Sequence, residues 1–234
     1  GRPFVAAVNR SAEQSAMDAF TLEMTDRRWW TDDTFEIRFV RPAGFDYLPG
    51  QKVGFVDGPL RRDYTLLGPL EADHLAICVR HIPGGRFSPR LAGARPGERF
   101  TVTAPFGYFT FKQPGHPVVW VATGTGIAPF VAFVRAGARG FDLLHGARTV
   151  ADLYYRDELS RSARRYVPCI SGPVPTVYEG PPLYEGRVGP CLAERWSPGR
   201  YDFYLCGRGD MIRDVMAIID THFEGAHVFT ERFY

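Results

Sequence analysis

The sequence lacks long apolar runs, closely spaced cysteines and, almost completely, lysine. No run reaches the roughly 18 apolar residues that a membrane-spanning helix needs. The first 20 residues, GRPFVAAVNRSAEQSAMDAF, lack the basic start and long apolar core of a secretory signal. We therefore expect a cytoplasmic protein with no membrane span.

The four cysteines, Cys78, Cys169, Cys191 and Cys206, form no CxxC pair. This spacing argues against a cysteine zinc site and against a plant-type iron–sulfur cluster. We expect no metal site, so any redox chemistry needs another group.

Only Lys52 and Lys112 are lysines among 28 basic residues, and the net charge of +2 is too small to indicate a nucleic-acid partner. The planar guanidinium of arginine suits phosphates and carboxylates. Genomic base composition explains the arginine excess equally well.

The 234 residues suffice for two ordinary domains, and 45% apolar with 23% charged residues is typical of globular proteins. Over residues 19–112, the runs TFEIRFV and HLAICVR place large apolar residues at every second position, and the turn sequences RPAGFDYLPG, IPGGRFSP and ARPGERF separate such runs. Short strands at this spacing predict an antiparallel barrel or sandwich. Residues 1–18 are expected to form an N-terminal tail.

After KQPGHP at residues 112–117, apolar strands alternate with helical stretches. The runs VVWVA, FDLLHGA, RRYVPCIS, DFYLCG and HVFTERFY predict five parallel strands, with helices at IAPFVAFVRAGA and MIRDVMAIIDTHF. The sequence therefore predicts a second, α/β nucleotide-binding domain over residues 113–234. Residues 172–189 are expected to be a long loop rich in proline and glycine.

Two glycine-containing turns follow predicted strands. In ATGTGIAPF, Gly124 and Gly126 allow a sharp turn at a helix start, where backbone N–H groups favour an anion such as a pyrophosphate. Pro129 is tolerated in the first turn of a helix. In CGRGDM, Cys206 follows another strand, at the carboxyl edge where open α/β sheets bind ligands. A purely structural turn and a buried core cysteine remain the alternatives.

Six motifs occur in one order: PGQ, RDYT, GGRFS, GTGIAPF, CGRGDM and a C-terminal ERFY. From about residue 20 to the end, the chain thereby resembles the ferredoxin–NAD(P) reductase superfamily. The resemblance implies a β-barrel that binds a flavin, an α/β domain that binds a nicotinamide dinucleotide, and an active site in the cleft between them.

The resemblance also assigns flavin-binding residues. Arg62 is expected at the flavin phosphates, Tyr64 along the isoalloxazine and ribityl, and Thr65 near N5, where the family more often has serine. Arg80 is a candidate for the adenylate end, which favours FAD over FMN. The remaining expected FAD contacts are Gly85, Arg86, Phe87 and Ser88 around the pyrophosphate, and Phe233 or Tyr234 over the flavin ring.

On the nicotinamide side, the resemblance places Cys206 and Glu231 beside the ring, where with Thr65 they form the expected catalytic set. Ser171 would contact the 2′-position of the adenosine. An arginine usually follows that serine in NADPH-specific relatives, but here Gly172 follows, so we favour NADH; Arg148, or Arg164 and Arg165, are possible substitutes. The other expected NAD(P) contacts are Thr123, Gly124, Gly126, Ile127, Ala128, Pro129, Gly207, Asp210 and Met211.

These motifs favour a flavoprotein reductase that moves electrons from NAD(P)H through FAD to a separate ferredoxin, flavodoxin or oxygenase component. Reduction of free flavin or ferric chelates is the enzymatic alternative. A non-catalytic nucleotide-binding subunit is the alternative of a different class.

Overall fold

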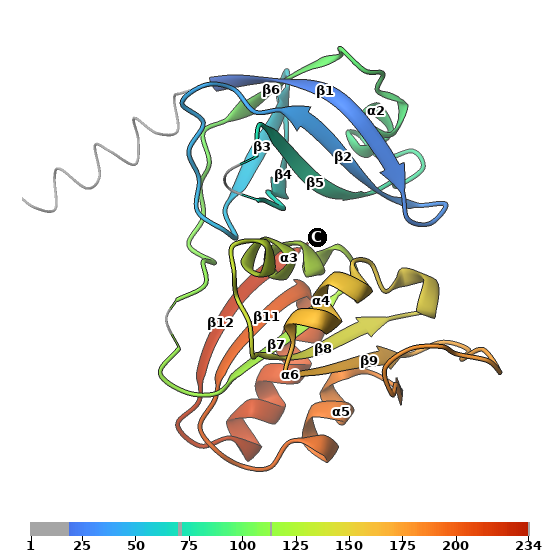
Figure 1. Cartoon of the computed structure of the whole chain (residues 1–234), viewed down its shortest axis with the longest axis vertical. Helices are drawn as coiled ribbons and strands as arrows, with labels where there is room; N and C mark the ends of the chain where they lie inside the picture. Colours follow the sequence, from blue (N-terminus) through green and yellow to red (C-terminus); the bar gives the residue numbers. More distant parts are fainter. Residues whose placement is uncertain (1–18, 70–71, 113, 234) are drawn as a thin grey trace, which may run out of the picture. The chain divides into compact units, whose positions relative to one another are not determined.

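The computed structural model describes residues 19–69, 72–112 and 114–233 (Figure 1). The chain divides into two compact units, Gly1–Tyr108 and Phe109–Tyr234. The tail expected over residues 1–18 lies outside the described residues. The domain boundary expected near residue 113 stays a prediction.

The first unit is a six-stranded antiparallel sheet in the order β4-β3-β6-β1-β2-β5. A bridge between Leu66 and Ile77 links the chain just after β4 to β5, which gives the sheet a barrel-like form. Its elements are β1 (Ala19–Trp29), β2 (Thr34–Val40), β3 (Lys52–Asp57), β4 (Leu60–Thr65), β5 (His74–Arg80), α2 (Ser88–Gly93) and β6 (Arg99–Thr103).

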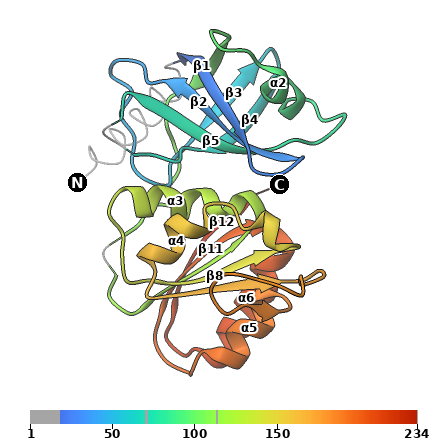
Figure 2. The same ribbon diagram turned by 45° about the vertical axis from the view of Figure 1, so that its right-hand side comes forward.

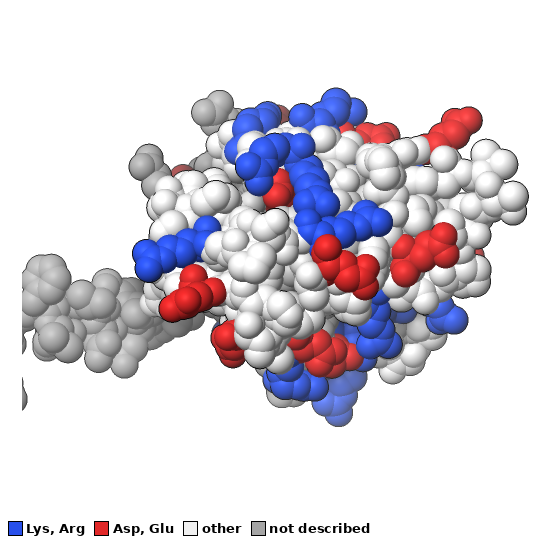
Figure 3. Space-filling model, turned by 90° about the horizontal axis from the view of Figure 1, so that it is seen from below, with Lys and Arg blue, Asp and Glu red and all other residues white. Residues whose placement is uncertain are grey.

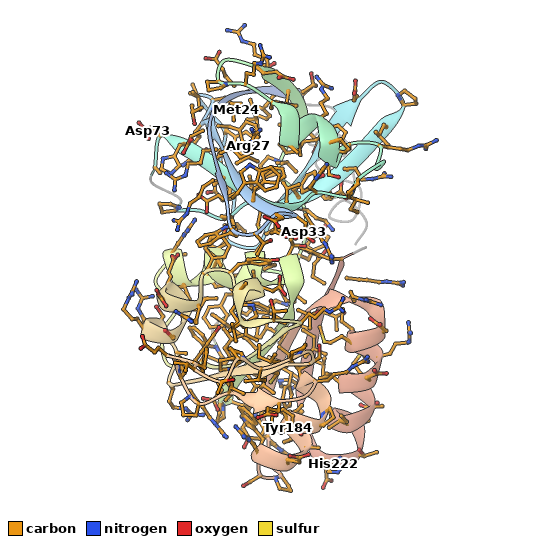
Figure 4. The ribbon with its side chains drawn as sticks, turned by 90° about the vertical axis from the view of Figure 1, so that its right-hand side faces the viewer. Met24, Arg27, Asp33, Asp73, Tyr184 and His222 are labelled. Atoms are coloured by element: carbon orange, nitrogen blue, oxygen red, sulfur yellow. The ribbon has the colours of Figure 1, made fainter. Side chains whose placement is uncertain are left out.

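Alternation along the strands builds the core of this unit. Phe35, Ile37 and Phe39 of β2 are fully buried, as the sequence pattern predicts for one face of a strand. Arg27, labelled in Figure 4, connects β1 to α2, because its Nη1 donates to the carbonyl oxygens of Leu91 and Ala94 at 3.2 and 3.0 Å.

The second unit is a parallel sheet in the order β10-β9-β8-β7-β11-β12. It has six strands, so the prediction of five was wrong. The extra strand, β10, is Tyr184–Glu185, which pairs with Cys169 and Ile170 of β9. The other strands are β7 (Val118–Thr123), β8 (Asp142–Ala147), β9 (Arg165–Ile170), β11 (Asp202–Arg208) and β12 (His227–Phe233).

Helices cover both faces of the parallel sheet, with α3 and α4 on one face and α5 and α6 on the other (Figures 1 and 2). Val119 and Val121 of β7 pack in the core under α5 and α6. Trp120, between them, points to the other face and stacks on Phe130 of α3. The helical segments are η1 (Gly124–Ile127), α3 (Ala128–Arg135), η2 (Val150–Asp152), α4 (Arg156–Ser162), α5 (Val188–Arg195) and α6 (Gly209–His222).

Within the described ranges, no helix is both long enough and apolar enough to cross a membrane.

Candidate functional site

Glycine is needed at the two positions of the turn after β7 for different structural reasons. Gly124 has a φ of +56°, and a Cβ there would meet nothing within 4 Å. A Cβ on Gly126 would lie 2.6 Å from the Cα of Gly207. Gly124 therefore makes the turn, whereas Gly126 lets η1 approach the end of β11. Ile127, which ends η1, is buried, as are Ala128 and Pro129, the first two residues of α3.

The carboxyl edge of the sheet brings Cys206 and Glu231 together. They are register partners in β11 and β12, and Cys206 also pairs with Ala122 of β7. The thiol is fully buried and Glu231 is half-buried. The sequence motifs name both residues, but only the strand order makes them neighbours.

A buried hydroxyl at this edge makes no hydrogen bond within the described part of the chain. Thr123 Oγ1 is buried and has no hydrogen-bond partner among the described residues. Gly207, with a φ of +146°, lies beside it, and a Cβ there would lie 3.1 Å from Met211 Cε. A buried polar atom of this kind costs free energy unless a ligand or water satisfies it.

Gly146 of β8 was missed by the sequence reasoning. A Cβ at this position would lie 2.8 Å from both Thr123 Cγ2 and Val188 Cγ1. The missing side chain therefore makes room for Thr123 at the carboxyl edge. A glycine within a buried strand, in FDLLHGA, was the available signal.

Asp210 is engaged within its own helix turn. Its Oδ1 accepts from the backbone N–H of Met211 at 2.9 Å, and its Oδ2 lies 2.8 Å from Arg208 Nη2. The Met211 N–H and the Arg208 guanidinium lower the pKa of Asp210. This carboxylate therefore stays ionised and supports the start of α6.

Ser171 continues the pairing of β9 with the end of β8. Its N–H donates to Ala147 O at 3.0 Å, and the N–H of Gly172 donates to Arg148 O at 2.9 Å. A Cβ on Gly172 would lie 2.6 Å from that same Arg148 oxygen. No side chain fits at residue 172 without a backbone shift, so the strand pairing itself explains the glycine.

Of the three substitute arginines, only Arg148 lies near Ser171. It is exposed and follows β8 directly. Arg165 begins β9, at the opposite edge, and lies 4.0 Å from the Trp196 ring centroid. Arg164 precedes it and forms a bidentate pair with Asp142, with N–O distances of 2.9 and 2.8 Å.

In the first unit, β4 presents a second unused hydroxyl. Thr65 Oγ1 is buried and lacks a hydrogen-bond partner in the described part of the chain. Tyr64 packs against the core near Phe55, and burial raises the pKa of its phenol to about 12, so the phenol remains a donor at neutral pH. Arg62 is exposed, and its Nη1 donates to Arg61 O at 2.8 Å.

The GGRFS segment turns from β5 into α2. The hydroxyl oxygen of Ser88 accepts the Ile82 N–H at 3.0 Å, and a Cβ on Gly85 would lie 2.8 Å from Ile82 O. Phe87 is a buried core residue, whereas Arg86 is exposed. The side chain of Phe87 serves the core, so the expected ligand contact of this residue is its backbone N–H. The Ser88 hydroxyl accepts the Ile82 N–H, and its own proton is the group expected to donate to a ligand.

Two further expected flavin contacts lie at strand ends. Arg80 ends β5 and pairs with Asp33, labelled in Figure 4, at 3.1 Å. Phe233 ends β12, opposite Arg208 of β11, and is half-buried. Tyr234 lies outside the described residues.

Residues 120–217 match the family model of the oxidoreductase NAD-binding domain. Ferredoxin–NADP reductase B of Sorangium cellulosum is 33% identical over 173 residues, which cover 66% of this chain and 68% of that protein. The chain belongs to the ferredoxin–NADP reductase superfamily.

Other members of the superfamily extend the comparison. The reductase component of propane 2-monooxygenase from Mycolicibacterium goodii is 30% identical, covering 82% of this chain but only 61% of that relative. The chain thus spans about three fifths of the length of that reductase component. A ferredoxin NADP+ reductase from Neisseria gonorrhoeae with bound FAD and NADP shares the fold, with a TM-score of 0.79 at 20% identity over 92% of this chain and 99% of that one.

Charges on the face drawn in Figure 3 are mixed. Basic and acidic side chains lie next to one another there. Among the described residues on this face, both signs of charge are therefore present side by side.

Proposed function

We propose that this reductase-family chain is an FAD-dependent NAD(P)H oxidoreductase. It takes electrons from NAD(P)H as hydride and passes them singly to a separate acceptor, such as a ferredoxin, a flavodoxin or an oxygenase component. A flavin supplies this chemistry when bound, because it accepts two electrons together and releases them one at a time. The chain's own residues bind the flavin and the nicotinamide, orient them toward each other and tune the reactivity of the flavin.

The buried hydroxyl of Thr65 carries the proposal. It has no partner among the described residues, yet it ends a strand whose neighbouring side chains suit a flavin. The exposed guanidinium of Arg62 suits phosphate oxygens, and the aromatic body of Tyr64 suits a ring system. The Thr65 hydroxyl would then bond to the flavin near its reactive nitrogen.

The carboxyl edge of the parallel sheet supports the nicotinamide assignment. The backbone turn at Gly124 supplies N–H groups for a pyrophosphate, while Thr123 offers an unused buried hydroxyl. Cys206 and Glu231, paired in register, would orient the nicotinamide ring. Hydride transfer depends on this orientation, because the reacting atoms must approach to about 3–3.5 Å.

We infer a preference for NADH over NADPH. The position after Ser171 cannot hold an arginine, since a Cβ on Gly172 would lie 2.6 Å from Arg148 O. Arg164 and Arg165 lie at the start of β9, away from Ser171 at its end. Of the three substitute arginines, Arg148 alone lies beside Ser171, and a single exposed arginine is a weaker clamp than a serine–arginine pair.

A separate acceptor is part of this proposal. Within these 234 residues the four cysteines are buried and do not follow the sequence spacing of an iron–sulfur motif. The printed name of the Mycolicibacterium goodii relative, a reductase component of a monooxygenase, supports an oxygenase component as the acceptor.

The test records the visible spectrum of the protein as purified and after FAD addition, then adds NADH and NADPH to separate anaerobic samples. A flavin spectrum that NADH bleaches faster than NADPH is the expected result. A protein that binds no FAD contradicts the proposal. Turnover of free flavin or ferric chelate that equals turnover with a ferredoxin or oxygenase component would contradict the assignment of a protein acceptor.

A further inference from the structure

Two histidines and an aspartate converge at the amino end of the parallel sheet, where β11 and β12 begin side by side (Figure 1). Asp202 begins β11 and is the register partner of His227, which begins β12. Asp202 is also the register partner of Val118, the first residue of β7, and His116 lies just before that strand. Three segments that are distant in sequence thus meet at one point.

Both imidazoles contact the same carboxylate oxygen. The Nδ1 atoms of His116 and His227 lie 3.1 and 3.0 Å from Asp202 Oδ1. All three ligand atoms lie within 4.8 Å of one another. Two nitrogens and one oxygen therefore face a common point.

The carboxylate is held in place while the histidines remain accessible. Asp202 Oδ2 accepts the backbone N–H groups of Gly115 and His116 at 2.9 and 3.2 Å. The Asp202 side chain is 6% exposed, but those of His116 and His227 are 29% and 62% exposed. An oriented buried acid beside two accessible imidazoles provides both a fixed ligand and an entry path.

We propose that His116, Asp202 and His227 bind a divalent transition metal of the Zn²⁺ class through the two Nδ1 atoms and Oδ1. Zinc lies about 2.0–2.2 Å from nitrogen and oxygen ligands, so ligand atoms of a tetrahedral site are about 3.3 Å apart. The two Nδ1–Oδ1 separations of 3.1 and 3.0 Å differ from this by a few tenths of an ångström, and metal binding would bring the two Nδ1 atoms to a similar separation from each other. Water completes the coordination, as in other zinc sites with three protein ligands.

Metal binding would replace two hydrogen bonds. Without metal, each Nδ1–H donates to Asp202 Oδ1. With metal, each Nδ1 binds the ion and each neutral ring carries its proton on Nε2, so the proton moves from Nδ1 to Nε2 by way of solvent and a neutral ring releases no net proton. Because the ligand atoms already face one another, only small side-chain movements are needed.

The metal would not take part in hydride transfer. Cys206 is four residues beyond Asp202 along β11, which corresponds to about 13 Å. The ion would instead connect the starts of β7, β11 and β12 and stabilise the second unit. This inference does not rest on the proposed function. The expectation of no metal site rested on cysteine spacing, and cysteine spacing cannot detect histidines that come together only through strand order.

The test titrates Zn²⁺ into tag-free, chelator-stripped protein by calorimetry and follows thermal unfolding. We expect one equivalent to bind and to raise the unfolding temperature. His227→Ala should weaken binding by more than about tenfold, and His116→Ala likewise. His222→Ala, at the exposed histidine of α6 labelled in Figure 4, is the matched control and should bind as the parent does. Asp202 is left intact because its carboxylate also holds Gly115 and His116.

Zinc-edge X-ray absorption of the loaded protein should count two imidazole ligands. No zinc binding by the parent chain, equal binding by His227→Ala, or sulfur among the ligands would each overturn the proposal.

Discussion

The hydroxyl of Thr65 should affect flavin affinity but not the stability of the flavin-free fold. Its hydroxyl is buried without a partner in the described structure, so the unliganded fold gains nothing from it, and a hydrogen bond to flavin would be worth about 0.5–1.5 kcal/mol. Thr65→Val should therefore keep or slightly raise the free energy of unfolding of the flavin-free protein. Flavin affinity should fall by up to about tenfold.

Fluorescence titration with FAD and urea unfolding of the flavin-free protein measure the two quantities separately. Thr65→Ser, which keeps the hydroxyl, is the control and should bind flavin nearly as the parent does. Equal FAD affinity in Thr65→Val and the parent would remove Thr65 from the flavin site.

His145 should make the second unit sensitive to mild acid. Its ring is fully buried in β8, with Nδ1 at 2.8 Å from the Tyr166 hydroxyl, and burial lowers its pKa to about 3. The unfolded chain takes up this proton below about pH 6.5, whereas the folded chain does not. The stabilisation is therefore complete above about pH 6.5 and decreases as pH falls toward 3, by up to about 1.4 kcal/mol per pH unit.

Urea unfolding between about pH 7 and pH 5, above the range where most carboxylates titrate, checks this slope. His145→Leu should lower the slope by about one proton. Identical slopes in the parent and His145→Leu would mean that His145 is protonated in the folded protein.

At the scale of the elements, alanine substitutions at the two glycines of η1 can be compared directly, because they test different structural requirements. Gly124→Ala places a side chain in open space at a φ of +56°, which costs about 1 kcal/mol. Gly126→Ala pushes a methyl group against the Cys206–Gly207 backbone, so η1 has to move away from β11 at a cost of about 1–3 kcal/mol or more. Thermal unfolding should show the larger loss for Gly126→Ala. A larger loss for Gly124→Ala would mean that the backbone conformation of the turn matters more for stability than the close contact of Gly126 with β11.

Element type was predictable wherever a pattern repeats. TFEIRFV and HLAICVR coincide with β2 and β5 at both ends, because each run is rich in β-branched and aromatic residues or other apolar residues and is bounded by turn sequences. The two residues of β10 carry no period and lie in a loop rich in proline and glycine, so only pairing with β9 defines them as a strand. The tight contact at Gly126 depends on β7 and β11 being neighbours, which no local pattern specifies.

At the scale of the whole molecule, each unit has a hydrophobic core of its own, as chain length and the change in pattern predict. The first core includes Phe35 and Phe55, and the second includes Val121 and Phe203. Separate cores should allow the two proposed cofactor-binding tasks to be disrupted one at a time. Motif order predicts which unit has which task, but the buried hydroxyls of Thr65 and Thr123, which have no hydrogen-bond partner among the described residues, are identified only from the packing around them.

Substitutions at Arg62 and Cys206 should separate the tasks of the two units. Arg62→Ala removes an exposed guanidinium from the proposed phosphate contact, so the purified protein should lose most of its flavin absorbance. Arg61→Ala is the matched control, because Arg61 pairs with Asp63 at 2.9 Å and should leave flavin content unchanged. Cys206→Ala should keep the flavin but slow its anaerobic bleaching by NADH by about tenfold or more, since in the proposed function the buried thiol and Glu231 orient the nicotinamide. Bleaching of Cys206→Ala at the parent rate would show that Cys206 is only a core residue, and full flavin content in Arg62→Ala would place the phosphates elsewhere.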